Sequence, residues 1–89
     1  MTTTAEFSAV ITDIQLESRE GADVRWRVAL STTGFQPGDT GILIAKSRSG
    51  TRFEVPVLRI INDAGDVWHI VEKPLAAGTD VIGRVSRRD

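Results

Sequence analysis

Acid–base or nucleophilic catalysis in this chain would have to use a single imidazole, because His69 is the only histidine and there is no cysteine. Activating a serine hydroxyl requires a base within hydrogen-bond reach. His69 lies in an alternating apolar stretch beside Trp68, where a half-buried ring bonded to backbone or to Glu72 is the commoner arrangement. The sequence therefore predicts no catalytic centre, and we expect a protein that is not an enzyme.

The carboxylates do not predict a metal or substrate site either. Asp63 and Asp66 flank a glycine in a predicted hairpin turn, where such side chains usually bond their own backbone. A calcium site needs more oxygen ligands than this short loop supplies. Glu54, Asp66 and Glu72 show no sign of the pocket that paired catalytic carboxylates require. Neither GxGxxG nor GxxxxGK[ST] occurs, so we expect no bound nucleotide. Taken with the carboxylate pattern, the sequence predicts no metal or other cofactor.

The basic residues form two groups that could contact a partner. One group surrounds a predicted hairpin tip and the other gathers near the C-terminus: Lys46, Arg48 and Arg52, then Arg84, Arg87 and Arg88. Either group could bind phosphates if the fold brings its members together, and the alternative is solubilising charge on exposed strands. A formal net charge of −1 argues against a general polyanion binder but allows a local basic patch.

Trp68 is the aromatic residue that could serve as a partner anchor. It has the opposite parity to Val67, His69 and Val71, so it could point outward as interface hot spots often do. Core packing is an equally compatible interpretation. Together with His69 and the six basic residues above, Trp68 completes the predicted partner-binding set.

The elements that would position these residues are β-strands. Apolar residues alternate with period two nearly everywhere, most clearly at Val24, Trp26, Val28 and Leu30. Further strands are predicted around residues 10–16, 42–44, 53–60, 66–72 and 80–86, separated by glycine-rich turns. No window carries a helical apolar stripe, so at most one helical turn is expected, near residues 75–77.

Pro56 marks a change in the apolar register. Phe53, Val55 and Val57 share one parity, whereas Leu58 and Ile60 lie outside that pattern. Because proline cannot donate to a strand ladder, a bulge or a sheet edge is predicted there.

These patterns predict an all-β fold: a small closed or nearly closed barrel of about six mostly antiparallel strands, with a sandwich as the alternative. Eighty-nine residues suit one domain spanning 1–89, with residues 1–5 and 87–89 expected to be flexible. The predicted core consists of Val10, Ile14, Trp26, Val28, Ile44, Phe53, Val55 and Val85. The start lacks a secretory pattern and no apolar stretch is long enough to span a bilayer, so we expect a cytoplasmic protein that binds no membrane.

Three segments, GFQPGDTGILI, GTRFEVPVLRI and PLAAGTDVIGRV, together resemble the second-domain β-barrel of translation elongation factors such as elongation factor Tu. Gly38 and Asp39 match the first glycine–acid turn of that family, and Gly78 and Asp80 approximate the second with one extra residue between them. The family's early strand usually carries a glycine where this chain has Trp26 or its neighbours, and the 89 residues include no GTPase domain. The resemblance implies a closed six-stranded barrel that docks protein or RNA, without nucleotide hydrolysis.

Three functions are compatible with this sequence. The first is a non-enzymatic protein-interaction or structural module that offers an edge or a hairpin to a protein partner or to another copy of itself. The second is a nucleic-acid-binding barrel that uses the basic hairpin tip and C-terminus. The third is a structural component of a larger particle such as a virion.

Overall fold

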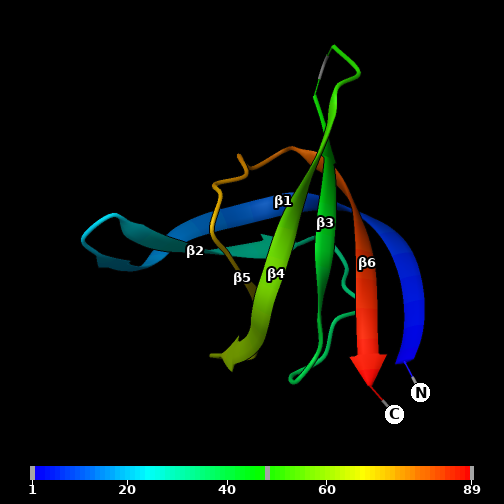
Figure 1. The fold of residues 1–89 in the computed structure, drawn as a ribbon, viewed down its shortest axis with the longest axis horizontal. Coiled ribbons are helices and arrows are strands. Elements are labelled where there is room, and N and C mark those ends of the chain that lie inside the picture. Colours follow the sequence, from blue (N-terminus) through cyan, green and yellow to red (C-terminus); the bar gives the residue numbers. More distant parts are fainter. Residues whose placement is uncertain (1, 48, 89) are drawn as a thin grey trace.

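The computed structural model describes residues 2–47 and 49–88 and shows six antiparallel strands joined in a closed barrel (Figure 1). The strands are β1 Thr2–Glu20, β2 Asp23–Leu30, β3 Thr40–Lys46, β4 Arg52–Asp63, β5 Asp66–Val71 and β6 Asp80–Arg88. Their order around the ring is β1-β2-β5-β4-β3-β6. The predicted all-β barrel of about six strands is therefore confirmed, and no helix occurs in the described ranges.

Two loops close the ends of the barrel, and each inserts one apolar side chain. Residues 31–39 join β2 to β3 and place Phe35 at 3% exposure, while residues 72–79 join β5 to β6 and place Leu75 at 2%. Figure 1 shows these loops at opposite ends of the β3 and β6 strands. Between the two plugs the core is filled by small and branched residues such as Val28, Leu43 and Val55. Burial of this interior stabilises a chain that has no disulfide.

In each of the two longest strands, a bulge changes which alternate side chains point into the barrel. In β1 the register with β2 shifts between Ile11 and Asp13, and in β4 the register with β5 shifts between Val57 and Arg59. One extra residue reverses which side chains face inward. The bulge predicted near Pro56 is therefore confirmed, two residues further along β4, with Leu58 as the extra residue.

The predicted core is corrected at three positions. Val10 and Ile44 are only half-buried because their neighbours Ile11 and Leu43 carry the inward parity. Phe53 is 40% exposed because it lies near the hairpin end of β4, beyond the β4 residues that pair with β5.

The remaining core predictions fit better. The side chains of Val28, Val55 and Val85 are buried, and those of Ile14 and Trp26 are half-buried and pack against the core.

The described residues near both ends of the chain belong to the sheet. Thr2 pairs with Arg88 and Ala5 with Val85, so the described terminal residues, expected to be flexible, form one continuous β1–β6 ladder. Met1 and Asp89 lie outside the described residues. Within the part of the chain that the structure describes, no helical segment has the length and apolar character to cross a membrane.

Two glycines let aromatic rings lie against the backbone inside the barrel. The Phe7 ring lies directly over Gly83, where a Cβ atom would overlap the ring, and Gly41 lies against the carbonyl of Arg84 and the Phe35 ring. Phe7 and Phe35 meet edge to face at 5.6 Å between ring centroids. The absence of side chains at these two positions is therefore what makes room for the aromatic plug.

We expect the substitution Gly83→Ala to destabilise the fold by about 1–3 kcal/mol, because the new methyl group overlaps the Phe7 ring in a packed interior. Urea denaturation followed by tryptophan fluorescence would measure this. In a double-mutant cycle, shortening the ring with Phe7→Leu should recover part of the loss. Additive effects of the two substitutions would contradict the proposed overlap.

Candidate functional site

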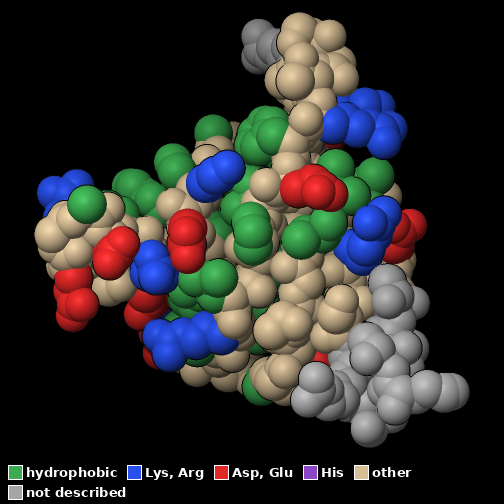
Figure 2. All heavy atoms as spheres, viewed as in Figure 1, with side chains coloured by type: hydrophobic (Ala, Val, Ile, Leu, Met, Phe, Trp, Pro, Cys, Tyr) green, Lys and Arg blue, Asp and Glu red, His purple; other side chains and the backbone are tan. Residues whose placement is uncertain are grey.

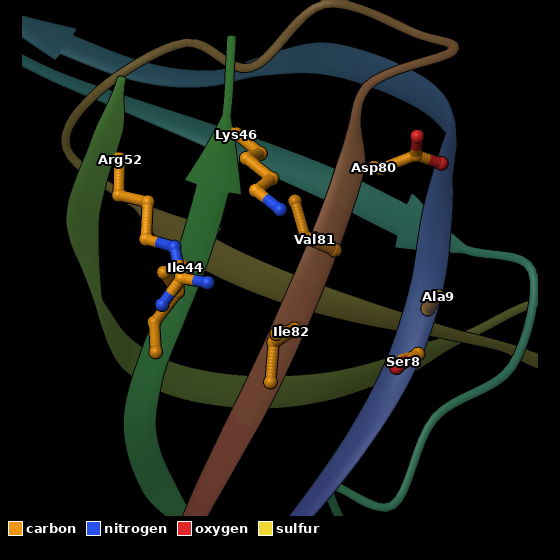
Figure 3. A pocket seen from close by; sticks show the side chains of 8 residues that line it. All are labelled: Ser8, Ala9, Ile44, Lys46, Arg52, Asp80, Val81 and Ile82. Carbon is orange, nitrogen blue, oxygen red and sulfur yellow. The ribbon is translucent and has the colours of Figure 1, made fainter. Parts of the chain in front are cut away.

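A hollow lies on the outside of the barrel where β1, β6, β3 and β4 run side by side (Figure 3). Strand register explains its composition. Ser8 of β1 pairs with Ile82 of β6, which pairs with Ile44 of β3, so these three outward side chains form one transverse row. The hollow has a volume of about 330 Å³ and is lined by Ser8, Ala9, Ile44, Lys46, Arg52, Asp80, Val81 and Ile82.

The floor of the hollow is apolar. Ile44 and Ile82 are both half-buried and occupy outward positions, between inward residues such as Leu43 and Val81. Two neighbouring isoleucines on the outside of a closed barrel cannot contribute to its core. They form instead a site that an apolar group of a ligand or partner could cover.

Two cations stand at one end of this floor. Lys46 of β3 and Arg52 of β4 are direct cross-strand partners, and Figure 3 shows the Arg52 side chain over Ile44 and the Lys46 side chain extending toward β6. Among the described residues, neither cation forms an ion pair. Asp80 also lines the hollow, but its side chain in Figure 3 points toward β1, away from the cations. Like charges directly opposite are unfavourable, so this pair favours an incoming anion.

The lining of the hollow supplies charged and apolar groups that could hold a ligand. Its lining includes one hydroxyl group, on Ser8, and no histidine that could act as its base. A carboxylate or phosphate could bind at the cations while an adjacent apolar group covers the isoleucines. The described residues also contain no cluster of three or more side chains suited to hold a metal ion.

The structure brings together only part of the predicted basic set. Lys46 and Arg52 meet in the hollow, whereas Arg48 lies outside the described residues. Arg84 lies further along β6 and donates a 2.8 Å hydrogen bond to the Glu6 carboxylate. Arg87 and Arg88 continue β6 opposite Thr3 and Thr2, so the C-terminal group lies toward the end of β6 remote from Asp80. The two predicted groups therefore do not form one patch.

Trp68 is not an exposed anchor, because its side chain is 6% exposed. The guanidinium of Arg27 lies 4.7 Å from the Trp68 ring centroid, and it also contacts Asp63 at 3.1 Å and Gln15 at 2.8 Å. Arg27 thus covers the tryptophan from β2 while bridging β1 and β4. The alternation along β5 correctly predicted that Trp68 and His69 point to opposite faces. The sequence did not show that Arg27 of β2 would cover the outward Trp68 side chain.

His69 is fully buried, at 0% exposure, so it cannot contact a partner at the surface. Its Nδ1 lies 2.9 Å from the Val28 carbonyl oxygen and its Nε2 lies 2.8 Å from Thr33 Oγ1. A carbonyl only accepts, so Nδ1 donates and the neutral Nε2 accepts from the threonine hydroxyl. Thr33 Oγ1 in turn accepts from the Phe35 amide at 3.0 Å. The predicted backbone partner is confirmed, and Glu72 instead pairs with Arg25.

This hydrogen-bonded chain gives His69 a structural task. Desolvation by burial lowers the pKa of His69 below 6.5, and the hydrogen bond to Val28 opposes that shift only in part. The Phe35 ring also meets the imidazole edge to face, at 5.3 Å between centroids. A neutral His69 therefore fixes the loop that carries the Phe35 plug.

Comparisons with protein-family models, with curated proteins and with solved structures found no match to this chain.

We expect the His69 ring to remain neutral below pH 6.5 in the folded protein. The unfolded chain takes up a proton near pH 6.5 and the folded chain only at lower pH. Stability should therefore fall as the pH drops from about 6.5 to the folded pKa, and should not depend on this group at higher pH. Because the chain has one histidine, its ring resonance reports the titration directly by NMR.

The variant His69→Gln provides the control for this prediction. It should lose about 1–3 kcal/mol at pH 7.5, because buried partners lose their hydrogen bonds, and it should show a weaker pH dependence between pH 7 and pH 5.5. A folded-state midpoint at or above 6.5 would contradict the structural assignment.

Proposed function

We propose that this protein is a non-enzymatic interaction module that binds a protein partner through the outer face of β1, β6, β3 and β4. The observation that carries the proposal is the outward pair Ile44 and Ile82, which forms the floor of an open hollow beside two cations without ion-pair partners among the described residues. An apolar centre bordered by charged groups is typical of a protein-binding surface.

The distribution of side chains over the whole face supports a protein partner. Figure 2 shows hydrophobic side chains gathered over β3, β4 and β6, with acidic and basic side chains among them. Ile42 pairs with Pro56 next to the hollow, which extends the apolar surface along β3 and β4. Such a surface gains free energy when a partner removes it from water.

The charges of this face favour protein over nucleic acid. Besides Asp80 in the hollow, Glu54 is the cross-strand partner of Ile44, and Glu6 forms an ion pair with Arg84. These carboxylates would repel a phosphate backbone, which is recognised mainly by uncompensated cations. A partner with its own mixture of carboxylates and apolar side chains fits better. The resemblance to the elongation-factor barrel, which implies a docking surface, agrees with this use, and the predicted location remains the cytoplasm.

The test is capture of a partner by tagged protein, with the variant Ile44→Glu compared with Leu58→Glu. Leu58 is 37% exposed and lies outside the hollow, so it is a matched control. We expect a stoichiometric protein to be retained by the wild type and by Leu58→Glu through nuclease and high salt, and to be lost from Ile44→Glu because a buried charge opposes docking.

Two outcomes would overturn this assignment. Equal retention of the partner by both variants would show that the binding site does not lie on this face. Retention only of material that nuclease and salt release would favour the nucleic-acid alternative, because phosphate contacts weaken steeply with salt.

A further inference from the structure

The outward side chains of β3 form a row in which two apolar residues are followed by a cation. Leu43 and Ala45 are buried inside the barrel. The residues that alternate with them point outward, and these are Ile42, Ile44 and Lys46. Both isoleucines are half-buried and Lys46 is exposed. Because alternate side chains of a strand lie about 7 Å apart, the row presents apolar, apolar and basic positions at a regular spacing.

The strands beside β3 widen each position of this row. Ile44 pairs with Ile82 of β6, so the second apolar position is two isoleucines wide. The basic position is two cations wide, since Lys46 pairs with Arg52 of β4. The first apolar position is continued onto β4 by the exposed Pro56. The order of the row therefore extends across neighbouring strands, which lie about 5 Å apart.

Two carboxylates border this surface and limit how much negative charge it can accept. Glu54 is exposed and is the cross-strand partner of Ile44, so it stands at the second apolar position. Asp80 lines the hollow, and its carboxylate points toward β1. Within the described ranges, neither acid forms an ion pair with Lys46 or Arg52. One carboxylate between the two cations is attracted, whereas further negative charge beside it would approach Glu54 or Asp80.

We propose that the hollow binds an extended segment of a partner protein in which alternate residues are aliphatic, aliphatic and acidic. This inference rests on the proposed function, because it uses the same face, and it adds the chemistry of the bound segment. The acidic side chain lies between Lys46 and Arg52. One aliphatic side chain covers Ile44 and Ile82, and the other covers Ile42.

The spacing of the row favours an extended segment. In an extended chain, residues i, i+2 and i+4 lie on one side and about 7 Å apart, which is the spacing of the outward side chains of β3. In a helix each step from i to i+4 turns by about 40° around the axis, so a third side chain would point away from the row. A segment laid over the sheet packs side chain against side chain and needs no free strand edge.

Two pentapeptides of identical composition test this inference, both acetylated and amidated so that they carry no terminal charge. In Val-Thr-Val-Thr-Glu the extended chain places the acid on the side of both valines, and in Val-Thr-Val-Glu-Thr it places the acid on the opposite side. Titration of the isotope-labelled protein would be followed through the amide NMR signals of Ile44, Lys46 and Ile82. At low salt we expect the first peptide to bind ~3–10-fold more tightly, and salt should reduce this preference.

A variant without the two cations, Lys46→Gln with Arg52→Gln, should bind the two peptides with equal affinity. The matched control is Arg59→Gln with Lys73→Gln, which removes the same charge from exposed residues outside the hollow and should keep the preference. The NMR signal of the buried His69 ring shows whether each variant is folded.

Several results would overturn the inference. These are equal affinity of the wild type for the two peptides, no response to either peptide, and a preference that survives removal of Lys46 and Arg52. A stronger response of the same amides to oligothymidylate than to the first peptide would assign the cations to phosphate instead. In each of these cases, loss of the captured protein from Ile44→Glu would still support the proposed function, which fails only when that variant retains its partner.

Discussion

The position of β6 between β1 and β3 is the constraint on which the rest of the structure depends. β6 pairs with β1 from Thr2 to Val10 and with β3 from Thr40 to Ala45, so it joins the two ends of the chain and closes the ring. The same strand supplies Gly83, over which the Phe7 ring lies inside the barrel, and Ile82, which lines the hollow outside. Inner packing and outer surface therefore both depend on the two long-range pairings of this one strand.

The buried side chain of His69 adds long-range contacts between other parts of the chain. His69 reaches from β5 to the backbone of β2 and to Thr33 in the following loop, and this loop carries Phe35 into the barrel. A buried imidazole is tolerable only while it is neutral and both ring nitrogens have partners. The single imidazole of the chain is thus hydrogen-bonded to the backbone and to Thr33 inside the barrel.

The sequence predicted those features of the fold that depend on local pattern. Period-two alternation located the six strands, and the change of apolar parity at Pro56 located the bulge in β4. It was harder to predict which side chains point into the barrel. Leu43 and its neighbours on β3 are all apolar, so the pattern does not indicate which of them face inward. The parity of β1 also changes after Ile11, where no proline or glycine marks the shift.

The candidate site could be predicted only in part for the same reason. Lys46 and Arg52 could be grouped from the sequence because they surround one predicted hairpin tip, and local sequence determines that pairing. Their position beside Ile82 depends on β6, which lies some thirty positions further along the chain, and no alternation pattern specifies strand order. Burial of Trp68 likewise depends on Arg27 from a non-consecutive strand.

Closure of the barrel also limits how this protein can bind. In an open sheet a partner adds a strand to a free edge, but in this ring every strand has two neighbours, and unpaired edges are left mainly where the β1–β2 hairpin extends past the barrel. Charged residues at such an extension prevent unwanted strand addition. Any charged residues would protect the edge in this way. Glu20 and Asp23 are direct cross-strand partners, so their carboxylates also repel each other within the hairpin. Groups of opposite charge reduce that repulsion and its counterpart at Lys46 and Arg52, so a partner of this closed ring would be recognised through side chains rather than through strand addition.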